Sequence, residues 1–296
     1  MNIEITDNLH TYFAIRKSLI NFLEQDLGTG DITSNCIIEP NTFASADLIC
    51  KSEEPATVAG LEEAGILFEI CGCTLQTFKR DGERVDKGCV VMKVIGLARS
   101  ILKAERTALN LIMRMSGIAT ETRKVIELVR KVNKSTRIAC TRKTASGLSY
   151  FDKKAVELGG GWSHRMRLDD MVLIKDNHLV LNPSIEDSAR LATEKTRGGL
   201  LLECEVKNLA ELCCAIRVDI DIIMLDNFSL EQAQTAMSTL MNLAHPKKIM
   251  IEMSGGIGLQ NILSYAQLNP DIISLGYITH SPKAIDFSLK IINDGD

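Results

Sequence analysis

Five basic side chains are grouped in one stretch of the sequence, beside three consecutive glycines. They are Arg142, Lys143, His164, Arg165 and Lys175, and the glycines occupy positions 159–161. Arginine offers paired donors to a carboxylate, lysine offers a compact charge, and glycine lets the backbone approach a ligand closely. Singly such residues are more often structural, but together they predict a pocket for a dicarboxylate, a phosphate or both. The basic residues at 123, 124, 130 and 131 are instead interpreted as a solvated helix face.

Two carboxylates, Glu205 and Asp226, follow consecutive predicted strands. We expect them to face the same pocket as the basic residues, where a magnesium ion that bridges substrate phosphates needs a few carboxylates and several waters. We therefore predict that they share a magnesium ion, bound directly or through water or substrate. The alternative is that they pair with Arg142 or Lys175, and the sequence leaves the two interpretations equally open.

A glycine loop, Ser254-Gly255-Gly256, follows another predicted strand, and Gly276 follows the next one. The loop precedes a helix that we expect to start near Leu259. In barrel enzymes the loops after the last strands, together with a helix N-terminus, commonly bind phosphate. The position of this loop, more than its short motif, therefore predicts a phosphate site.

These residues follow a series of short apolar strands that alternate with helical stretches. The strands read RIAC, MVLIK, LLECEV, DIIML, KIMIEM and DIISL. This alternation predicts parallel strands with crossover helices, and in an α/β barrel the loops after the strands build the active site. The series is shorter than a complete barrel requires. We therefore expect an α/β fold with an incomplete barrel of six to seven strands.

The part of the chain before this series mixes helices and strands and predicts an N-terminal α+β sandwich domain. Helical periodicity covers residues 12–25 and 61–70, and β-rich pieces lie at 46–51 and 90–95. The helical pattern of residues 99–133 is interrupted at Ser116-Gly117. The interruption predicts a pair of connected helices.

We expect three segments, and one motif in the first of them suggests another class of protein. The segments are 1–115 (N-terminal domain), 116–280 (barrel) and 281–296 (a C-terminal helix that packs back on the N-terminal domain). The stretch DGERVDKGCVVMKVIG resembles lipoyl or biotinyl carrier modules, which belong to carrier or interaction proteins. Lys87 and Lys93 lack the flanking pattern of a modified lysine. A structural sandwich is therefore favoured.

The composition indicates a folded, soluble protein. The 296 residues include 45% hydrophobic and 24% charged side chains, with a formal net charge of −4. This balance argues against nucleic-acid or membrane partners, and the first residues lack a signal-peptide pattern, so we expect a cytoplasmic location. The nine cysteines are an odd number and lie mostly in apolar runs, which predicts free thiols.

Several long segments resemble the quinolinate phosphoribosyltransferase family, in order and over nearly the whole chain. They are EQDLGTGDITS (24–34), ERTALNLIMRMSGIAT (105–120), TRKTASGLSYFDKKAVELGGGWSHRMRLDDMVLIKDNHL (141–179), IIMLDN (222–227), EMSGGI (252–257) and LGYITHS (275–281). The resemblance implies decarboxylating phosphoribosyl transfer to quinolinate, which gives nicotinate mononucleotide for NAD biosynthesis. It also implies a magnesium cofactor and a homodimer, or a higher assembly such as a hexamer.

The resemblance also implies a role for each matching residue. The residues implied to bind quinolinate or phosphoribosyl pyrophosphate are Arg106 (from the partner subunit), Thr141, Arg142, Lys143, His164, Arg165, Lys175, Glu205, Asp226, Ser254, Gly255, Gly256, Leu275, Gly276 and Tyr277. Of these, Lys143, Lys175, Glu205 and Asp226 are the expected catalytic residues, and Glu205 and Asp226 the expected magnesium ligands.

Some positions depart from the family pattern without removing a charged ligand. Ala145-Ser146 stands in place of Thr-Pro, Ser163 in place of Asn, Arg167 in place of Gly, and Tyr277 in place of a small residue. A related family, the phosphoribosyltransferase-like protein found with molybdate transport, is the alternative. Its pattern usually lacks the IKDNH segment that is intact here at 174–178.

Overall fold

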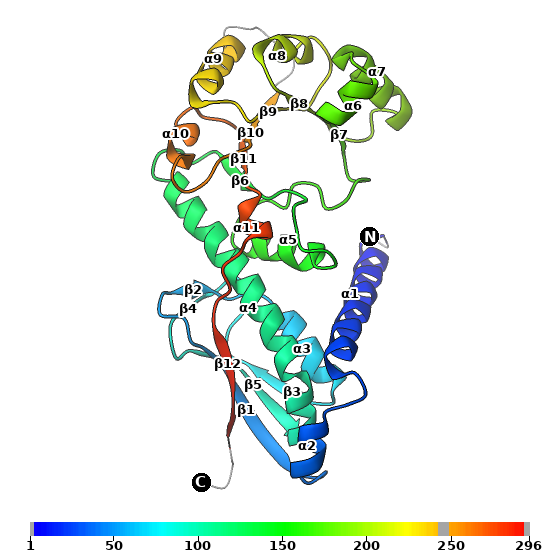
Figure 1. Ribbon diagram of the computed structural model, residues 1–296, viewed down its shortest axis with the longest axis vertical. Helices are drawn as coiled ribbons and strands as arrows, with labels where there is room; N and C mark the ends of the chain where they lie inside the picture. Colours follow the sequence, from blue (N-terminus) through cyan, green and yellow to red (C-terminus); the bar gives the residue numbers. More distant parts are fainter. Residues whose placement is uncertain (1–2, 242–248, 293–296) are drawn as a thin grey trace. The chain divides into compact units, whose positions relative to one another are not determined.

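The computed structural model describes residues 3–241 and 249–292. The chain consists of two compact units (Figure 1). The first comprises Met1–Thr120 and Lys283–Asp296, and the second comprises Glu121–Pro282. The division falls a few residues after the boundary at 115/116 that the sequence suggested.

The first unit is built on an antiparallel sheet with the strand order β12-β1-β5-β3. Its elements are α1 (Ile3–Leu27), α2 (Ile32–Ile37), β1 (Phe43–Cys50), β2 (Ala56–Thr57), α3 (Leu61–Ile70), β3 (Thr74–Thr77), β4 (Arg84–Val85), β5 (Val90–Leu97), the first part of α4 (Ala98–Val129) and β12 (Phe287–Ile292). Gly65 of α3 approaches Leu75 and Met92 of the sheet. The lack of a side chain lets α3 pack close to the sheet, so that Leu48 and Phe68 become fully buried.

The C-terminal segment corrects one of our predictions, because it is a strand and not a helix. β12 pairs antiparallel with β1, from Ser45 opposite Ile292 to Cys50 opposite Phe287. Its sequence, FSLKII, has a buried Phe287 and β-branched residues at its end, which suit an edge strand. The segment does pack on the first unit, but it does so by extending the sheet.

The helix α4 corrects a second prediction, because it runs without interruption through Ser116 and Gly117. The Ser116 hydroxyl accepts a hydrogen bond from the Ala59 N–H at 3.0 Å and donates one to the Ala59 carbonyl. A side chain at Gly117 would lie 2.2 Å from the carbonyl oxygen of Lys283. Ser116 and Gly117 therefore let the backbone of Ala59 and Lys283 pack directly against α4. Neither α4 nor any other described helix has the length and apolar character needed to cross a membrane.

The second unit is a parallel α/β sheet with the strand order β6-β11-β10-β9-β8-β7. Its elements after α4 are β6 (Arg137–Ala139), α5 (Ser149–Leu158), β7 (Val172–Ile174), α6 (Asp176–Leu181), α7 (Ile185–Thr196), β8 (Leu202–Val206), α8 (Leu209–Ala215), β9 (Ile222–Asp226), α9 (Leu230–Met241), β10 (Met250–Ser254), α10 (Ile262–Ala266), β11 (Ile272–Ser274) and α11 (Tyr277–His280). The sheet curves, with α7, α8 and α9 along its outer side (Figure 1). The predicted α/β class and incomplete barrel are confirmed, at the lower end of the expected strand number.

The sequence of these strands explains why they form a buried parallel sheet. The residues of β8 and β9 are almost all buried, as expected for strands covered on both faces. β9 (IIMLD) is apolar up to its last residue, whereas β8 (LECEV) also carries Glu203 and Glu205. Glu203 in β8 and Glu252 in β10 are fully buried, and both belong to the site.

Candidate active site

Two cavities lie side by side at the carboxyl ends of the strands of the second unit. The smaller has a volume of about 300 Å³ and the larger about 520 Å³. Thr141, Lys143, Asp226, Ser254 and Ser274 line both. The two cavities therefore form one site with two compartments that share a wall.

The smaller cavity collects the basic residues that the sequence analysis singled out. It is lined by Arg142, Lys143, His164, Arg165 and Lys175, together with Glu205 and Asp226. Burial, and after it the nearby charge of Arg142, lowers the pKa of Arg165, while the charges of Glu203 and Glu205 oppose this effect. The buried Arg165 and the exposed Arg142 are thus held close enough for their guanidinium charges to repel each other. An anion with two acceptor groups would relieve this repulsion.

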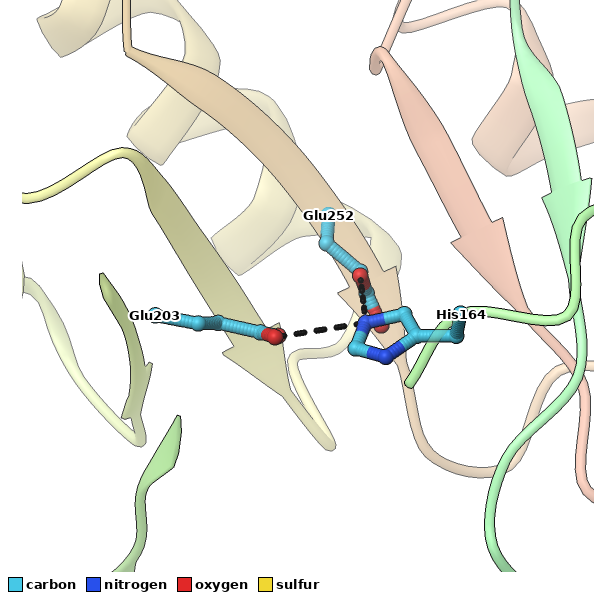
Figure 2. A group of neighbouring side chains, drawn as sticks. All are labelled: His164, Glu203 and Glu252. Carbon is cyan, nitrogen blue, oxygen red and sulfur yellow. Dashed lines mark hydrogen bonds and ion pairs between the residues drawn. The ribbon is translucent and has the colours of Figure 1, made fainter. Parts of the chain in front are cut away.

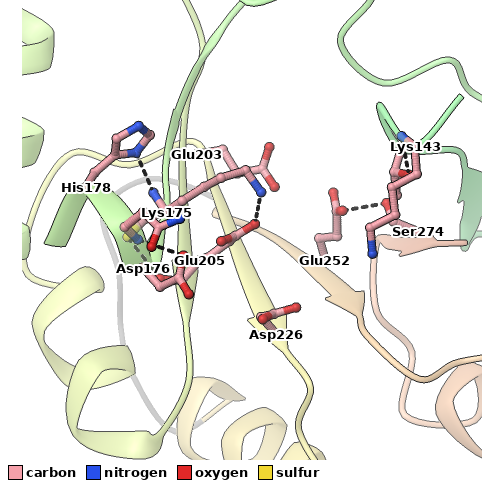
Figure 3. Close-up of polar contacts among 12 residues, drawn as sticks. Lys143, Lys175, Asp176, His178, Glu203, Glu205, Asp226, Glu252 and Ser274 are labelled. Carbon is pink, nitrogen blue, oxygen red and sulfur yellow. Dashed lines mark hydrogen bonds and ion pairs between the residues drawn. The ribbon is translucent and has the colours of Figure 1, made fainter. Parts of the chain in front are cut away.

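Of the two carboxylates predicted to hold magnesium, Glu205 forms an ion pair with a lysine and Asp226 accepts a hydrogen bond from a side-chain amide. Lys175 Nζ donates to Glu205 Oε1 (Figure 3), which is the pairing that the sequence left open as an alternative. Asp226 Oδ2 accepts a hydrogen bond of 2.9 Å from the Asn227 side chain. Both carboxylates line the smaller cavity. The two carboxylates therefore fit a magnesium ion, and in this arrangement Glu205 contacts both Lys175 and the ion.

The IKDNH segment positions Lys175 at the smaller cavity, and its other residues stabilise the start of α6. Lys175 is the N-cap of α6, and its N–H donates to His178 Nδ1 at 2.9 Å. Asp176 forms an ion pair of 2.9 Å with Lys207. Lys175 alone of these three segment residues lines the smaller cavity, while His178 and Asp176 fix the start of the helix that carries it.

The glycine loop after β10 forms one wall of the larger cavity. Gly255 has φ +90°, and a side chain there would lie 2.3 Å from Asn227 Oδ1. The Asn227 N–H donates to the Ser254 carbonyl at 2.9 Å. The loops after β9 and β10 are therefore interlocked, and only glycine fits at 255. The following helix, α10, begins at Ile262, slightly later than we expected.

Another part of the wall of the larger cavity comes from the segment after β11, the strand next to β10. Gly276 and Tyr277 line the larger cavity, and the Tyr277 hydroxyl donates to Glu121 Oε1 at 3.0 Å. Burial, and then the neighbouring Glu121 carboxylate, raises the pKa of Tyr277. The hydroxyl thus stays protonated as a donor that ties this segment to α4. Tyr277 is accommodated at the rim of the cavity and leaves it open.

A buried cluster of ionisable groups, which our sequence reasoning missed in part, lies at the floor of the smaller cavity. His164 Nε2 is 3.0 Å from Glu252 Oε2 and 3.2 Å from Glu203 Oε2 (Figure 2). The clue in the sequence was a glutamate in the middle of each apolar strand, in LLECEV and KIMIEM. The strand-end pattern does not cover positions inside a strand, so it leaves these two glutamates out.

The proton content of this cluster differs from that of isolated side chains. Burial alone would lower the pKa of His164, but its hydrogen bonds to Glu203 and Glu252 raise it to about 9. Burial raises the pKa of Glu203 to about 7. The Arg165 N–H donates to His164 Nδ1 at 2.9 Å, which conflicts with a hydrogen on that atom. Since this contact is made by the backbone, we place the ring hydrogen on Nε2 and the additional proton on the carboxylate pair.

Two residues named from the sequence line neither cavity. Leu275 is buried, and its N–H donates to the Ala139 carbonyl at 2.9 Å, so it has a structural role here. Arg106 lies in the part of α4 that belongs to the first unit and is exposed. The departure Arg167 is also exposed and forms an ion pair with Asp169.

The fold and the site define an α/β-barrel enzyme that binds anionic substrates at its strand ends. The family model of the quinolinate phosphoribosyl transferase C-terminal domain matches residues 118–290, and the model of the N-terminal domain matches residues 31–116. The chain therefore belongs to the quinolinate phosphoribosyl transferase family.

Individual relatives agree with this assignment over nearly their whole length. A probable nicotinate-nucleotide pyrophosphorylase (carboxylating) of Methanocaldococcus jannaschii is 43% identical over 93% of this chain and 96% of its own. The Mycobacterium leprae enzyme with that name is 35% identical, over 94% and 97%. The structure of the nicotinate-nucleotide pyrophosphorylase from Francisella tularensis superposes with a TM-score of 0.85, at 34% identity, and covers 94% of this chain and 96% of its own.

Proposed function

We infer that the chain catalyses the reaction of its family, as a carboxylating nicotinate-nucleotide pyrophosphorylase of NAD biosynthesis. It joins quinolinate to phosphoribosyl pyrophosphate and releases carbon dioxide and pyrophosphate, which leaves nicotinate mononucleotide. The observation that carries this inference is the pair of cavities with a common wall. One compartment is cationic and suits a small dianion, and the other is lined by glycine loops that suit a phosphate.

Quinolinate is assigned to the smaller cavity. Arg142 and Arg165 repel each other there, and two carboxylates on one ring supply the paired acceptors that guanidinium groups match best. Lys175 completes the cationic lining, and the His164 ring lies beside it. Thr141 adds a hydroxyl at the shared wall.

Phosphoribosyl pyrophosphate is assigned to the larger cavity and to the shared wall. The loop of Ser254, Gly255 and Gly256 offers backbone N–H groups to the 5-phosphate, and Gly276 and Tyr277 line the same cavity. Leu275 supports this wall from within the core. This assignment brings the ribose to the junction of the two compartments.

The chemistry then depends on position and charge at the junction. The pyridine nitrogen of quinolinate forms a bond to ribose carbon 1 as the bond from that carbon to pyrophosphate breaks, and no covalent enzyme intermediate is needed. Lys143 lines both compartments, so its charge is available to the departing pyrophosphate and to the carboxylate that is lost. The pyridinium nitrogen accepts electron density as that carboxylate leaves as carbon dioxide, and a proton takes its place.

Magnesium is the proposed cofactor, held by Glu205 and Asp226 or through waters bound to them. Two carboxylates in one cavity suit an ion that keeps several waters and binds substrate phosphates. When bound, magnesium neutralises charge on the pyrophosphate. Lys175, which pairs with Glu205, keeps that carboxylate oriented before the substrate arrives.

The proposed assembly is a homodimer in which Arg106 completes the site of the neighbouring subunit. Arg106 is exposed and lines neither cavity of its own chain. A two-fold interface would use the same arginine twice, once in each site. A hexamer built from such dimers would keep this arrangement.

The direct test supplies quinolinate, phosphoribosyl pyrophosphate and magnesium and measures the release of carbon dioxide and of pyrophosphate; pyrophosphate release is the readout shared with nicotinate, which has no carboxylate to lose. Nicotinate, which lacks the second carboxylate, leaves a buried cation unpaired at a cost of roughly 2 to 5 kcal/mol. We therefore expect kcat/KM with nicotinate to be lower by a factor of about 30 or more. A matched Arg142→Lys protein should lose part of this preference. Equal rates with both acids would contradict the proposed substrate.

A further inference from the structure

The chemistry described above uses His164 but gives no role to Glu203 and Glu252, the two glutamates of the buried cluster. Glu203 precedes the cavity residue Glu205 by two positions in β8, and Glu252 precedes Ser254 by two in β10. Since side chains two positions apart in a strand share a face, both glutamates point toward the site, where Glu252 lines the smaller cavity and Glu203 lies behind it. Both are 0% exposed.

The cluster holds His164 on a backbone that few residues adopt. His164 has φ +54°, a left-handed conformation that is uncommon for residues other than glycine and persists only where surrounding contacts enforce it. Its ring lies 4.9 Å from the ring of Trp162, and the buried Lys153 ammonium donates to the preceding Ser163 carbonyl. The turn is therefore fixed on both sides of the ring.

The two ring nitrogens of His164 connect the cluster to Arg165. Nε2 contacts the two glutamates, and Nδ1 accepts the Arg165 N–H at 2.9 Å. Arg165 is 7% exposed and lines the smaller cavity. The glutamates thus act on the part of the backbone from which the Arg165 guanidinium extends.

Glu203 depends on this arrangement for its polar contact. In the described part of the chain neither of its oxygens has a hydrogen-bond partner of good geometry, and its contact is the 3.2 Å approach to His164 Nε2. Glu252 also accepts a hydrogen bond from the Ser274 hydroxyl. A buried carboxylate with so few partners is costly, which indicates that Glu203 is retained for its effect on His164 and Arg165.

A metal ion is the other explanation for such a cluster. One ligand atom from each of the three residues lies within 4.8 Å of the others. However, a metal would need the lone pair of Nε2, and the hydrogen would then move to Nδ1, where it would face the Arg165 N–H. The hydrogen-bond pattern therefore favours a clamp over a metal site.

We propose that Glu203 and Glu252 are positioning residues for the dicarboxylate substrate: they clamp His164 Nε2 and thereby fix the His164–Arg165 turn that aims Arg165 into the smaller cavity. This proposal rests on the proposed function. It predicts an effect on quinolinate binding that is absent from phosphoribosyl pyrophosphate binding, since the larger cavity contains none of these residues.

The test compares conservative and disruptive variants at each glutamate. Glu203→Gln and Glu252→Gln keep an oxygen that accepts the Nε2 hydrogen, so the Kd for quinolinate should stay within about threefold of wild type. Glu203→Met and Glu252→Met remove the acceptor, so that Kd should rise about tenfold, and more in the double variant. The Kd for phosphoribosyl pyrophosphate should stay within about threefold throughout.

A double-mutant cycle tests whether the effect passes through His164. Asparagine tolerates a left-handed backbone and places an acceptor where Nδ1 stands, so His164→Asn should retain the contact with the Arg165 N–H. In a His164→Asn background Glu252→Met should have no further effect on the Kd for quinolinate. Glu63→Gln, which changes a buried carboxylate of the first unit, is the matched control and should leave both constants unchanged.

Three results would overturn the proposal. One is an unchanged quinolinate Kd in the double Met variant, and another is an equal loss of affinity for both substrates, as general destabilisation would cause. The third is calorimetric binding of zinc or manganese that Glu252→Met abolishes and Glu205→Gln does not. If wild type does not turn over quinolinate, the proposed function fails. If wild type is active and the variants behave like it, only the clamp fails.

Discussion

At the residue scale, the floor of the smaller cavity links substrate binding to proton content. In the folded chain, burial raises the pKa of Glu203 to about 7. The two carboxylates raise the pKa of His164 to about 9, against the opposing effect of burial. In the unfolded chain both groups titrate at their lower, ordinary values. The folded protein therefore holds more protons than the unfolded chain at neutral pH.

This difference predicts that stability falls as pH rises. The cluster's contribution is complete below the unfolded-state pKa values and is lost as pH rises through about 7 and then about 9. Urea unfolding should show a lower free energy of unfolding at about pH 9.5 than at about pH 6. Glu203→Gln removes one titrating group. Between about pH 6 and the folded-state pKa of about 7 that group accounts for about one pH unit of the decline, so the decline should shrink by roughly 1 kcal/mol. The same decline in wild type and Glu203→Gln would contradict this assignment.

The residues of the site were predictable to the extent that they stand at strand ends. Arg142, Lys143, Lys175 and Asp226 follow apolar runs, and parallel strands bring such positions to one edge. Glu203 and Glu252 were missed because a strand's middle is normally apolar, and only the three-dimensional pairing with His164 explains a charge there. The choice of Lys175 as the partner of Glu205 also depends on side-chain geometry that spacing does not fix.

At the element scale, α4 shows how a glycine can be needed for packing and not for flexibility. The segment from Lys283 crosses α4 at Gly117, where a side chain would lie 2.2 Å from the Lys283 carbonyl oxygen. The Ile285 N–H donates to the Met113 carbonyl at 3.0 Å one turn earlier. Glycine and serine usually weaken a helix, so propensity alone predicted a break. The tertiary contacts outweigh that preference.

Gly117→Ala should destabilise the protein although the residue is helical. In an open helix this substitution stabilises by roughly 0.5 to 1 kcal/mol, but here it forces the 283–285 segment away from α4, at a cost of about 1 to 3 kcal/mol. Urea unfolding measures the sign. Lys124→Ala, at an exposed position of the same helix, should change stability by less than about 0.5 kcal/mol. A gain in stability for Gly117→Ala would show that the crossing segment moves freely.

At the scale of the whole molecule, the order of strands and helices in the second unit could be predicted from the sequence, but the pairing of the C-terminal strand β12 with β1 could not. Alternating strands and helices predicted the second unit because each strand carries its own apolar run and each connection its own helical period. β12 depends instead on an edge that β1 offers from far away in the chain, with Ser45 opposite Ile292 and Cys50 opposite Phe287, and a short local pattern cannot specify such a partner. Helix α4 belongs to both units, so no composition change marks their boundary.

The same scale contains the last prediction, that each active site takes Arg106 from a neighbouring chain. An Arg106→Ala chain keeps a sound barrel but supplies no arginine, whereas a Lys143→Ala chain has a defective barrel but supplies Arg106. In a mixed dimer one site then combines an intact barrel with an intact Arg106. Random reassortment puts about half of the dimers in the mixed form, each with one working site of two, so about one quarter of wild-type activity should return.

The control mixes two chains whose defects both lie in the barrel, Lys143→Ala and Arg165→Ala. Lys143 and Arg165 line the smaller cavity of their own chain, so every site in every mixed dimer keeps one barrel defect, and no activity should return. Native mass spectrometry confirms that subunits have exchanged in both mixtures. If exchange is complete and the first mixture stays as inactive as the second, Arg106 serves no neighbouring site, and its exposed position on α4 must be explained within its own chain.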